Sequence, residues 1–132
     1  STASRMGLDN TPGPLQYEAL RALCVKVLDP LRVILSVPIH VESGYRSPAV
    51  NAAVGGETRS QHLMGLAADI TAHGFDTAQI LAIVRDAGLP VDQCINEFGE
   101  WIHISHVPGG PQRGQFLRAY RLDGKRVYEK VP

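Results

Sequence analysis

The stretch from Ser60 to Thr71 reads SQHLMGLAADIT, and it decides much of the fold. Its second half, Leu66 to Thr71, is short and apolar, which predicts a buried strand. Asp69 interrupts this apolar run. A buried carboxylate is costly unless it is paired, hydrogen-bonded or bound to a metal. Asp69 is therefore a candidate metal ligand, and an ion pair with an arginine or the capping of a turn is the structural alternative.

A second stretch, Trp101 to Ser105, reads WIHIS and predicts another strand. Because side chains alternate between the two faces of a strand, Ile102 and Ile104 suit the core. His103 then faces the opposite side of the sheet, toward a cleft or solvent. A half-exposed strand that carries a histidine by chance is the alternative interpretation.

His62 lies among small residues just before the strand that holds Asp69. Small side chains leave room for a ligand or another backbone to approach closely. Two imidazoles and one carboxylate form a common ligand set of catalytic zinc sites. Zinc makes hydroxide available near neutral pH, and a nearby carboxylate then has to carry the proton. These residue types indicate a candidate zinc site of His62, Asp69 and His103.

Apolar residues recur at helical spacing from Leu20 to Leu28, which predicts an amphipathic helix. Pro30 is expected to end or kink this helix, with a further helical turn or two over residues 31–35. Cys24 lies on the apolar stripe and Cys94 in a short strand-like run. Free cysteine behaves as a small hydrophobic residue, so we expect two buried free thiols.

The remaining elements mix helices with strands. Asp76 and Gln79 have the spacing of a capping box, at the start of a helix that Gly88 and Pro90 end. Asp123-Gly124 is a strong hairpin turn signal. Further strands are expected over residues 39–45, 93–97, 101–105, 116–121 and 126–131, a short helix over 49–54, and a loop or irregular turn over 57–64.

This order of elements favours an α+β fold, with a small, mainly antiparallel sheet and helices packed on one face. The chain has 132 residues, which fits one domain over residues 1–132. Within it we distinguish a lead-in segment over residues 1–14 and a C-terminal hairpin over residues 115–132. The hydrophobic content of 44% and the charged content of 20% are ordinary for a globular protein.

The charges of the chain balance, with 13 lysines and arginines against 13 acidic residues. A net charge of zero gives no bulk attraction to nucleic acid. No apolar run approaches the roughly 20 residues that a membrane span needs. The first ten residues lack the apolar run of a signal peptide, and a cleaved signal would leave the same sequence. We expect a monomer without a nucleic-acid partner or a membrane span.

Three segments together resemble the motifs of the zinc D-Ala-D-Ala peptidase family. The family's S-x-H-x-x-G-x-A-x-D motif is matched position by position by Ser60, His62, Gly65, Ala67 and Asp69. The WIHIS run resembles the second motif, W-[VI]-H-[IV]-S, and residues 43–51 resemble an S-G-Y-R-S-P…N segment. The order and spacing are similar to the branch found in phage and prophage proteins, and the resemblance covers nearly all of residues 1–107.

The resemblance implies the fold shared by these peptidases and the hedgehog signalling domain, with zinc as the cofactor. The zinc ligands that it implies are His62, Asp69 and His103. It also implies that Arg46 and Ser60 hold the substrate. A guanidinium suits a terminal carboxylate because it can bind it in bidentate fashion. An ion pair of Arg46 with Glu42 or Glu57 is the structural alternative.

Two acids, Glu97 and Glu100, are candidates for the general base. The E-x-x-H spacing of the related dipeptidases points to Glu100, whereas the phage-type branch has its acid six residues before the last ligand, at Glu97. A three-residue loop would pair Glu97 with Trp101 and place Glu97 on the face of His103, while a two-residue turn would place it on the other face. We favour Glu97, and we expect Trp101 to line the cleft.

The function that follows is a zinc metallopeptidase that hydrolyses peptidoglycan stem peptides, with D-Ala-D-Ala carboxypeptidase as the first hypothesis. One alternative is an endopeptidase that cuts between L-Ala and D-Glu, as some lysins do. Another is a catalytically silent, zinc-stabilised binding or structural module, for which loss of the general base would be typical. Either activity implies action on the cell wall, in the periplasm or outside the cell.

Overall fold

The computed structural model describes residues 2–57 and 59–132. Its helices are α1 (Thr2–Met6), α2 (Pro14–Leu23), the π-helix η1 (Cys24–Leu28), α3 (Asp29–Leu35), α4 (Pro48–Ala53), the 3₁₀-helix η2 (Gln61–Met64) and α5 (Thr77–Asp86). Its strands are β1 (Ile39–Ser43), β2 (Ala67–Ala72), β3 (Gln93–Glu97), β4 (Trp101–Ser105), β5 (Gln115–Leu122) and β6 (Lys125–Lys130). No helix within the described ranges is long and apolar enough to cross a membrane.

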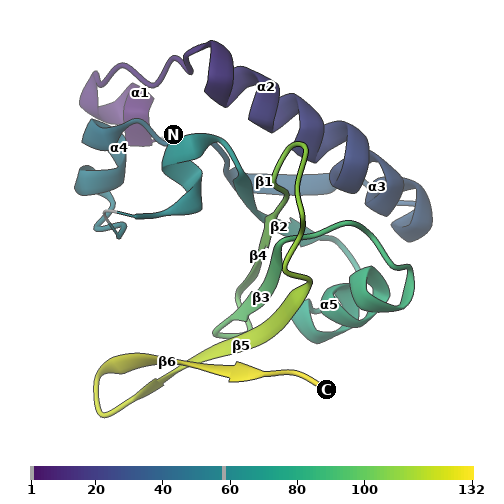
Figure 1. Ribbon diagram of the computed structural model, residues 1–132. Coiled ribbons are helices and arrows are strands. Elements are labelled where there is room, and N and C mark those ends of the chain that lie inside the picture. The colour runs from purple at the N-terminus through teal and green to yellow at the C-terminus, as the bar shows by residue number, and fades with distance from the viewer. Residues whose placement is uncertain (1, 58) are drawn as a thin grey trace.

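In the described part of the chain the strands form one sheet in the order β1-β2-β4-β3-β5-β6 (Figure 1). Every neighbouring pair is antiparallel except β3 and β5, which run parallel. The predicted α+β class with a mainly antiparallel sheet is therefore confirmed. The parallel pair was not predicted. It forms because the chain returns after β4 to the start of β3, where the N–H of Gln115 donates to the carbonyl of Asp92.

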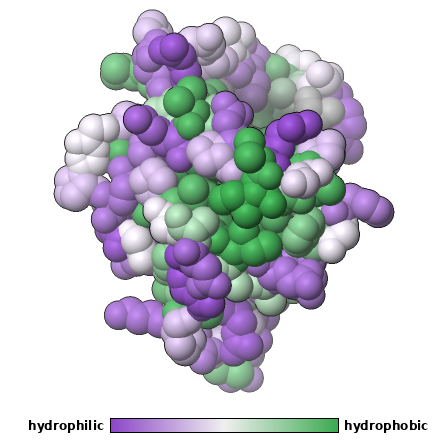
Figure 2. All heavy atoms as spheres, turned by 90° about the vertical axis from the view of Figure 1, so that its right-hand side faces the viewer, coloured by the Kyte–Doolittle hydropathy of each residue, from purple (hydrophilic) through white to green (hydrophobic). Residues whose placement is uncertain are grey.

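The core lies on one face of this sheet. Alternate residues of the central strands point into it, among them Ile70 of β2 and Ile102 and Ile104 of β4, and all three are fully buried. The long helical segment from α2 to α3 and the helix α5 pack on the same face, with Leu31 and Ile80 in the core. Figure 2 shows apolar side chains gathered in the middle of the side on which α3 and α5 lie.

The helical run from α2 to α3 continues through Pro30 (Figure 1). Within η1 the N–H of Asp29 donates to the carbonyl of Cys24, five residues back. Proline has no N–H, and the wider π turn admits its ring without ending the helix. Buried residues consequently recur every four positions, at Leu23, Val27, Leu31 and Leu35.

This wider spacing turns Cys24 away from the core, and the expectation that it is buried is wrong, because Cys24 is exposed. Cys94, on β3, is buried as expected, and both thiols are free. Burial raises the pKa of Cys94 to about 12, so this thiol stays protonated at neutral pH.

Local signals elsewhere are confirmed. The capping box at the start of α5 is complete: the N–H of Gln79 donates to Asp76 Oδ1 over 2.8 Å, and the N–H of Asp76 donates to Gln79 Oε1 over 2.9 Å. Asp123 and Gly124 both have positive φ, as the predicted hairpin turn requires.

Helix α1 was not predicted, and η2 lies where a loop was expected, in a segment whose residue 58 is outside the described residues. A single helical turn is too short to show periodicity.

Candidate metal centre and active site

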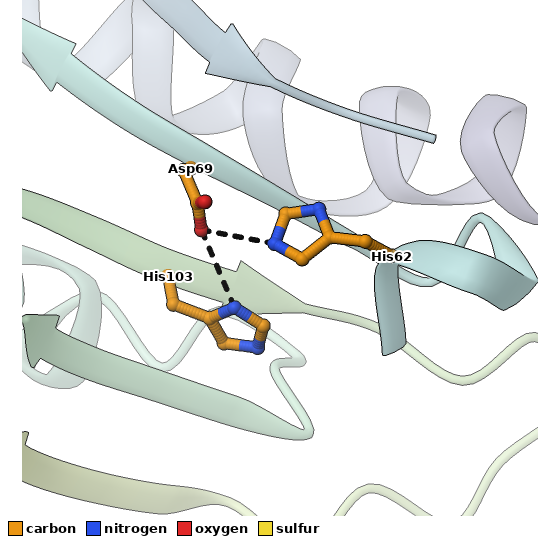
Figure 3. A group of neighbouring side chains, drawn as sticks. All are labelled: His62, Asp69 and His103. Carbon is orange, nitrogen blue, oxygen red and sulfur yellow. Dashed lines mark hydrogen bonds and ion pairs between the residues drawn. The ribbon is translucent and has the colours of Figure 1, made fainter. Parts of the chain in front are cut away.

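Three predicted ligands converge on the sheet face opposite the core (Figure 3). His62 Nε2 lies 3.1 Å from Asp69 Oδ1, and His103 Nδ1 lies 3.4 Å from the same oxygen. One donor atom from each residue lies within 4.8 Å of the others. This arrangement brings two imidazole nitrogens and one carboxylate oxygen close enough to hold a single metal ion.

The strands place two of these side chains. Asp69 on β2 and His103 on β4 are directly opposite each other, and opposite residues of an antiparallel pair project from the same face of the sheet. His62 comes from η2, at whose start the Ser60 hydroxyl accepts a hydrogen bond from the His62 N–H over 3.2 Å. The short helix therefore fixes the third ligand at the edge of the strand pair.

Gly65 ends η2 and leads the chain into β2. Its φ is +71°, in the left-handed region that favours glycine. A Cβ at this position would also lie 2.5 Å from the carbonyl oxygen of Gln16. The glycine of the motif is thus required both by its own backbone conformation and by the packing of α2 against it.

The outer nitrogen of His62 is held by the backbone. His62 Nδ1 lies 2.7 Å from the carbonyl oxygen of Gly44, and the side chain is only 2% exposed. Because a carbonyl can only accept, Nδ1 carries the hydrogen, and Nε2 is left as the nitrogen that can bind a metal. Metal-ligating histidines are usually oriented by such a contact.

Asp69 has the charge state that a ligand needs. Burial alone would raise its pKa, but the contacts with the imidazoles of His103 and His62 hold the pKa of this carboxyl well below its usual range. The carboxylate is therefore ionised at neutral pH, as metal binding requires. Two imidazole nitrogens and one carboxylate oxygen, with one side open to a cavity, match the donor set of catalytic zinc sites. The three residues fit a zinc ion.

The β3–β4 hairpin places the two candidate bases differently. Glu97 lies directly opposite Trp101, and the connection is a three-residue loop in which the N–H of Glu100 donates to the carbonyl of Glu97 over 3.0 Å. Phe98 and Gly99 in this loop have φ of 60° and 70°. The register is the one that we expected to place Glu97 on the face of the metal ligands.

The environments of the two acids differ. Glu97 is 5% exposed, and its Oε2 has no hydrogen-bond partner among residues 2–57 and 59–132. Desolvation raises the pKa of Glu97, while the positive charge of Arg126 opposes that rise. A buried carboxylate with a raised pKa and a free oxygen is suited to accept a proton. Glu100 is exposed and borders a separate hollow with Arg118 and Tyr120.

A cavity of about 420 Å³ unites the predicted site residues. Apart from Glu100, the candidate site residues from the sequence all line it: Arg46, Ser60, His62, Asp69, Glu97, Trp101 and His103. The Trp101 ring stands edge-on to Phe98, with ring centroids 6.0 Å apart. The structure thus brings these residues together, and their individual roles stay predictions.

Arg46 reaches this cavity with unused hydrogen-bonding capacity. Its Nη2 donates to Ser60 Oγ over 3.3 Å, and its buried Nε has no partner within the described residues. The ion pairs found in that part of the chain do not include one with Glu42 or Glu57. Burial lowers the pKa of Arg46, and the charge of Asp69 opposes this shift. The guanidinium therefore keeps donors for an anionic ligand.

Among the cavity residues that sequence reasoning missed are Arg126 and Tyr128 on β6. Glu97 pairs with Ala119, and Ala119 pairs with Tyr128, so one row of side chains runs from the candidate base to the last strand. Arg126 Nη1 donates to the Tyr128 hydroxyl over 3.3 Å. Alternation along β6 could have grouped these two residues, but only the parallel pairing of β3 with β5 places them at the site.

A comparison with family models agrees with this geometry. The model of a family described as Peptidase M15 matches residues 1–105, which include all three candidate ligands and the β3–β4 hairpin. The match ends before β5 and β6. No curated protein matches the chain. With four fifths of the sequence matched, the chain belongs to the peptidase M15 family of zinc D-Ala-D-Ala peptidases.

Proposed function

We propose that this chain is a zinc-dependent D-alanyl-D-alanine carboxypeptidase that trims the stem peptides of peptidoglycan. Its family indicates a zinc peptidase with a peptidoglycan-type substrate. One observation carries the proposal: a three-donor metal centre and an unpartnered carboxylate oxygen of Glu97 share one cavity. This combination supplies both the electrophilic and the proton-transfer parts of a peptide hydrolysis.

Zinc would be held by His62, Asp69 and His103. When bound, zinc acts as a Lewis acid that polarises a carbonyl oxygen and makes hydroxide available near neutral pH. The protein contributes by keeping Asp69 ionised and by turning Nε2 of His62 toward the centre.

Glu97 is the general base in this proposal. Its Oε2 accepts a proton from the attacking water, whose oxygen forms the new bond to the scissile carbonyl carbon. As the carbon–nitrogen bond breaks, Glu97 transfers this proton to the amine nitrogen of the leaving D-alanine. The raised pKa of Glu97 supports both steps, because a group that holds a proton more readily near neutral pH can take it up and release it.

Arg46 would anchor the free carboxylate of the terminal D-alanine. A guanidinium binds a carboxylate through two parallel hydrogen bonds, and the Nε of Arg46 is unpartnered in the described residues. Ser60 holds Nη2 of Arg46 and so fixes the direction of the fork. Trp101 would offer its ring as an apolar wall for the methyl groups of the substrate.

A carboxypeptidase of this kind works where stem peptides are exposed. We therefore propose that the chain acts on the cell wall, in the periplasm or outside the cell.

The test is mass spectrometry of defined muropeptides incubated with the zinc-loaded protein and with a chelated control. The proposal predicts loss of one alanine from the pentapeptide stem, abolished by the chelator. Arg46→Lys should raise KM more than it lowers kcat, because a lysine loses the bidentate contact. Cleavage inside the stem would make the enzyme an endopeptidase, and the absence of any chelator-sensitive product would favour the silent module.

A further inference from the structure

A chain of hydrogen bonds runs away from the metal centre behind His103. Gln61 Oε1 lies 3.1 Å from His103 Nε2, and Gln61 Nε2 donates to Asp92 Oδ2 over 2.9 Å. Asp92 in turn accepts from Arg113, whose Nη2 lies 2.6 Å from the same oxygen. Gln61 therefore bridges a candidate ligand and an ion pair whose carboxylate is buried.

We propose that Gln61 is a positioning residue for the metal centre. It holds His103 in the tautomer whose Nδ1 lone pair is free to bind a metal beside Asp69. The inference rests on the proposed zinc site and goes beyond its ligands. It assigns a task to a side chain that is not one of the three candidate ligands and has no part in the mechanism above.

Asp92 fixes the direction in which these hydrogen bonds are donated. It is 2% exposed and accepts hydrogen bonds from the backbone N–H, Nε and Nη2 of Arg113. These contacts, the hydrogen bonds of the Arg113 side chain first, lower the pKa of Asp92. An ionised carboxylate can only accept hydrogen bonds. The amide nitrogen of Gln61 must therefore face Asp92, and the amide oxygen must face His103.

The orientation of Gln61 then fixes the histidine. An amide oxygen can only accept, so a His103 that binds a metal through the lone pair of Nδ1 keeps its hydrogen on Nε2 and donates it to Gln61. The opposite tautomer would leave two acceptors facing each other at 3.1 Å. His103 Nδ1 is the nitrogen beside Asp69 Oδ1, where a metal would be shared. His62 is oriented in the same way, because the Gly44 carbonyl accepts from its Nδ1 as the Gln61 amide oxygen accepts from His103 Nε2.

The ion pair that orients Gln61 joins two separate parts of the chain. Asp92 directly precedes β3, whereas Arg113 lies in the connection to β5. Arg113 is outside the segment matched by the family model. The structure thus lets residues beyond the matched segment influence the metal centre without contacting it.

Gln61→Met tests the inference because it keeps the length of the side chain and removes both hydrogen bonds. We expect zinc affinity, measured by competition with a chromophoric chelator, to fall about 10- to 100-fold, as is usual when the outer partner of a ligand is lost. Gln79→Met is the matched control, since it removes a hydrogen-bonded glutamine at the start of α5. This control should leave zinc affinity unchanged.

A second variant and a second measurement separate positioning from loss of structure. In Asp92→Asn the asparagine can donate to Gln61, so the amide of Gln61 can turn over and present its N–H to His103. Nitrogen-15 NMR of the zinc-loaded protein should show a slowly exchanging Nε2–H of His103 in the wild type, and a faster-exchanging one in Gln61→Met and Asp92→Asn. A wild type that binds no zinc contradicts the proposed function. Equal exchange of this proton and equal zinc affinities in wild type, Gln61→Met and Asp92→Asn contradict this inference alone.

Discussion

The two faces of the central strands have opposite roles, although they alternate residue by residue. On β4 the side chains of Ile102 and Ile104 are fully buried in the core, while His103 between them turns to the cavity. On β2 Ile70 is fully buried next to Asp69, which points the other way. The core face stabilises the fold by burying apolar surface. The site face holds ionisable groups whose free energies depend on their partners and on pH.

This contrast shows that one face of the sheet can gather the candidate catalytic groups while the other face holds the fold together. Neighbouring strands in register bring Asp69, His103 and Glu97 together on one face, and the helices on the other face keep the strands in place. Changes on the site face should therefore alter activity and pH dependence, and changes on the core face should alter stability.

The largest effect is expected from Glu97→Gln. Removing the general base should lower kcat about 10²- to 10⁴-fold, while the protein keeps its zinc because the three ligands remain. Turnover of a pentapeptide stem and zinc content after gel filtration are the two measurements. A variant that loses its zinc together with its activity would show that Glu97 belongs to the metal centre instead.

On the core face, Ile102→Ala should lower the free energy of unfolding more than His103→Ala does on the site face. Ile102 is fully buried, and truncation of such a side chain costs about 2–5 kcal/mol because it leaves a cavity. Denaturant unfolding of the metal-free protein measures this loss. An equal loss of stability in His103→Ala would contradict the claim that the core face stabilises the fold and the site face does not.

Zinc binding at the site face should stabilise the whole fold. A ligand that binds only the folded state adds about 2.7 kcal/mol of stability at a concentration one hundred times its Kd. Thermal unfolding with and without zinc should show this gain, and Asp69→Asn should remove most of it. A gain that survives in Asp69→Asn would place the metal elsewhere.

A smaller effect concerns pH. Desolvation raises the pKa of Glu97 above its ordinary value of 4.5, so the folded state binds this proton more tightly than the unfolded state does. The contribution of Glu97 to stability is therefore fully present below pH 4.5 and is lost as pH rises through the raised pKa. Metal-free Glu97→Gln should be more stable than the wild type near pH 7. This advantage should shrink toward acidic pH, and an advantage that grows there would contradict the assignment.

The smallest effect is expected from Glu100→Gln. Glu100 is exposed at the hairpin turn, and surface changes of this kind usually alter stability by less than about 0.5 kcal/mol. Its kcat should match that of the wild type. An equal loss of turnover in Glu100→Gln and Glu97→Gln would overturn the choice of Glu97 as base.

Much of the site could be predicted because its chemistry lies in short motifs. Asp69 was conspicuous as an acid in an apolar strand, and strand alternation placed His103 on the side away from the core. The choice of Glu97 depended on the length of one turn, a local property. Strand alternation needed only neighbouring residues, and the resemblance to the peptidase family supplied the ligand set and the spacing that points to Glu97.

Features that depend on distant contacts were not predictable in this way. The exposure of Cys24 follows from the π turn that precedes Pro30, which changes the spacing of buried residues along the helix. Arg126 reaches the cavity only because β5 pairs with β3 rather than with β4, and single-strand patterns do not encode the partner. The bridge from Gln61 to Asp92 joins side chains 31 positions apart.

The measurement that tests the central claim most directly is a crystal structure of the zinc-soaked protein with anomalous data at the zinc edge. We predict one strong peak at the cavity, about 2.0–2.2 Å from His62 Nε2, Asp69 and His103 Nδ1. Glu97 should stay outside the coordination sphere, within reach of a water in the cavity. A zinc ion at another place, or one bound through the opposite nitrogen of His103, would contradict the account.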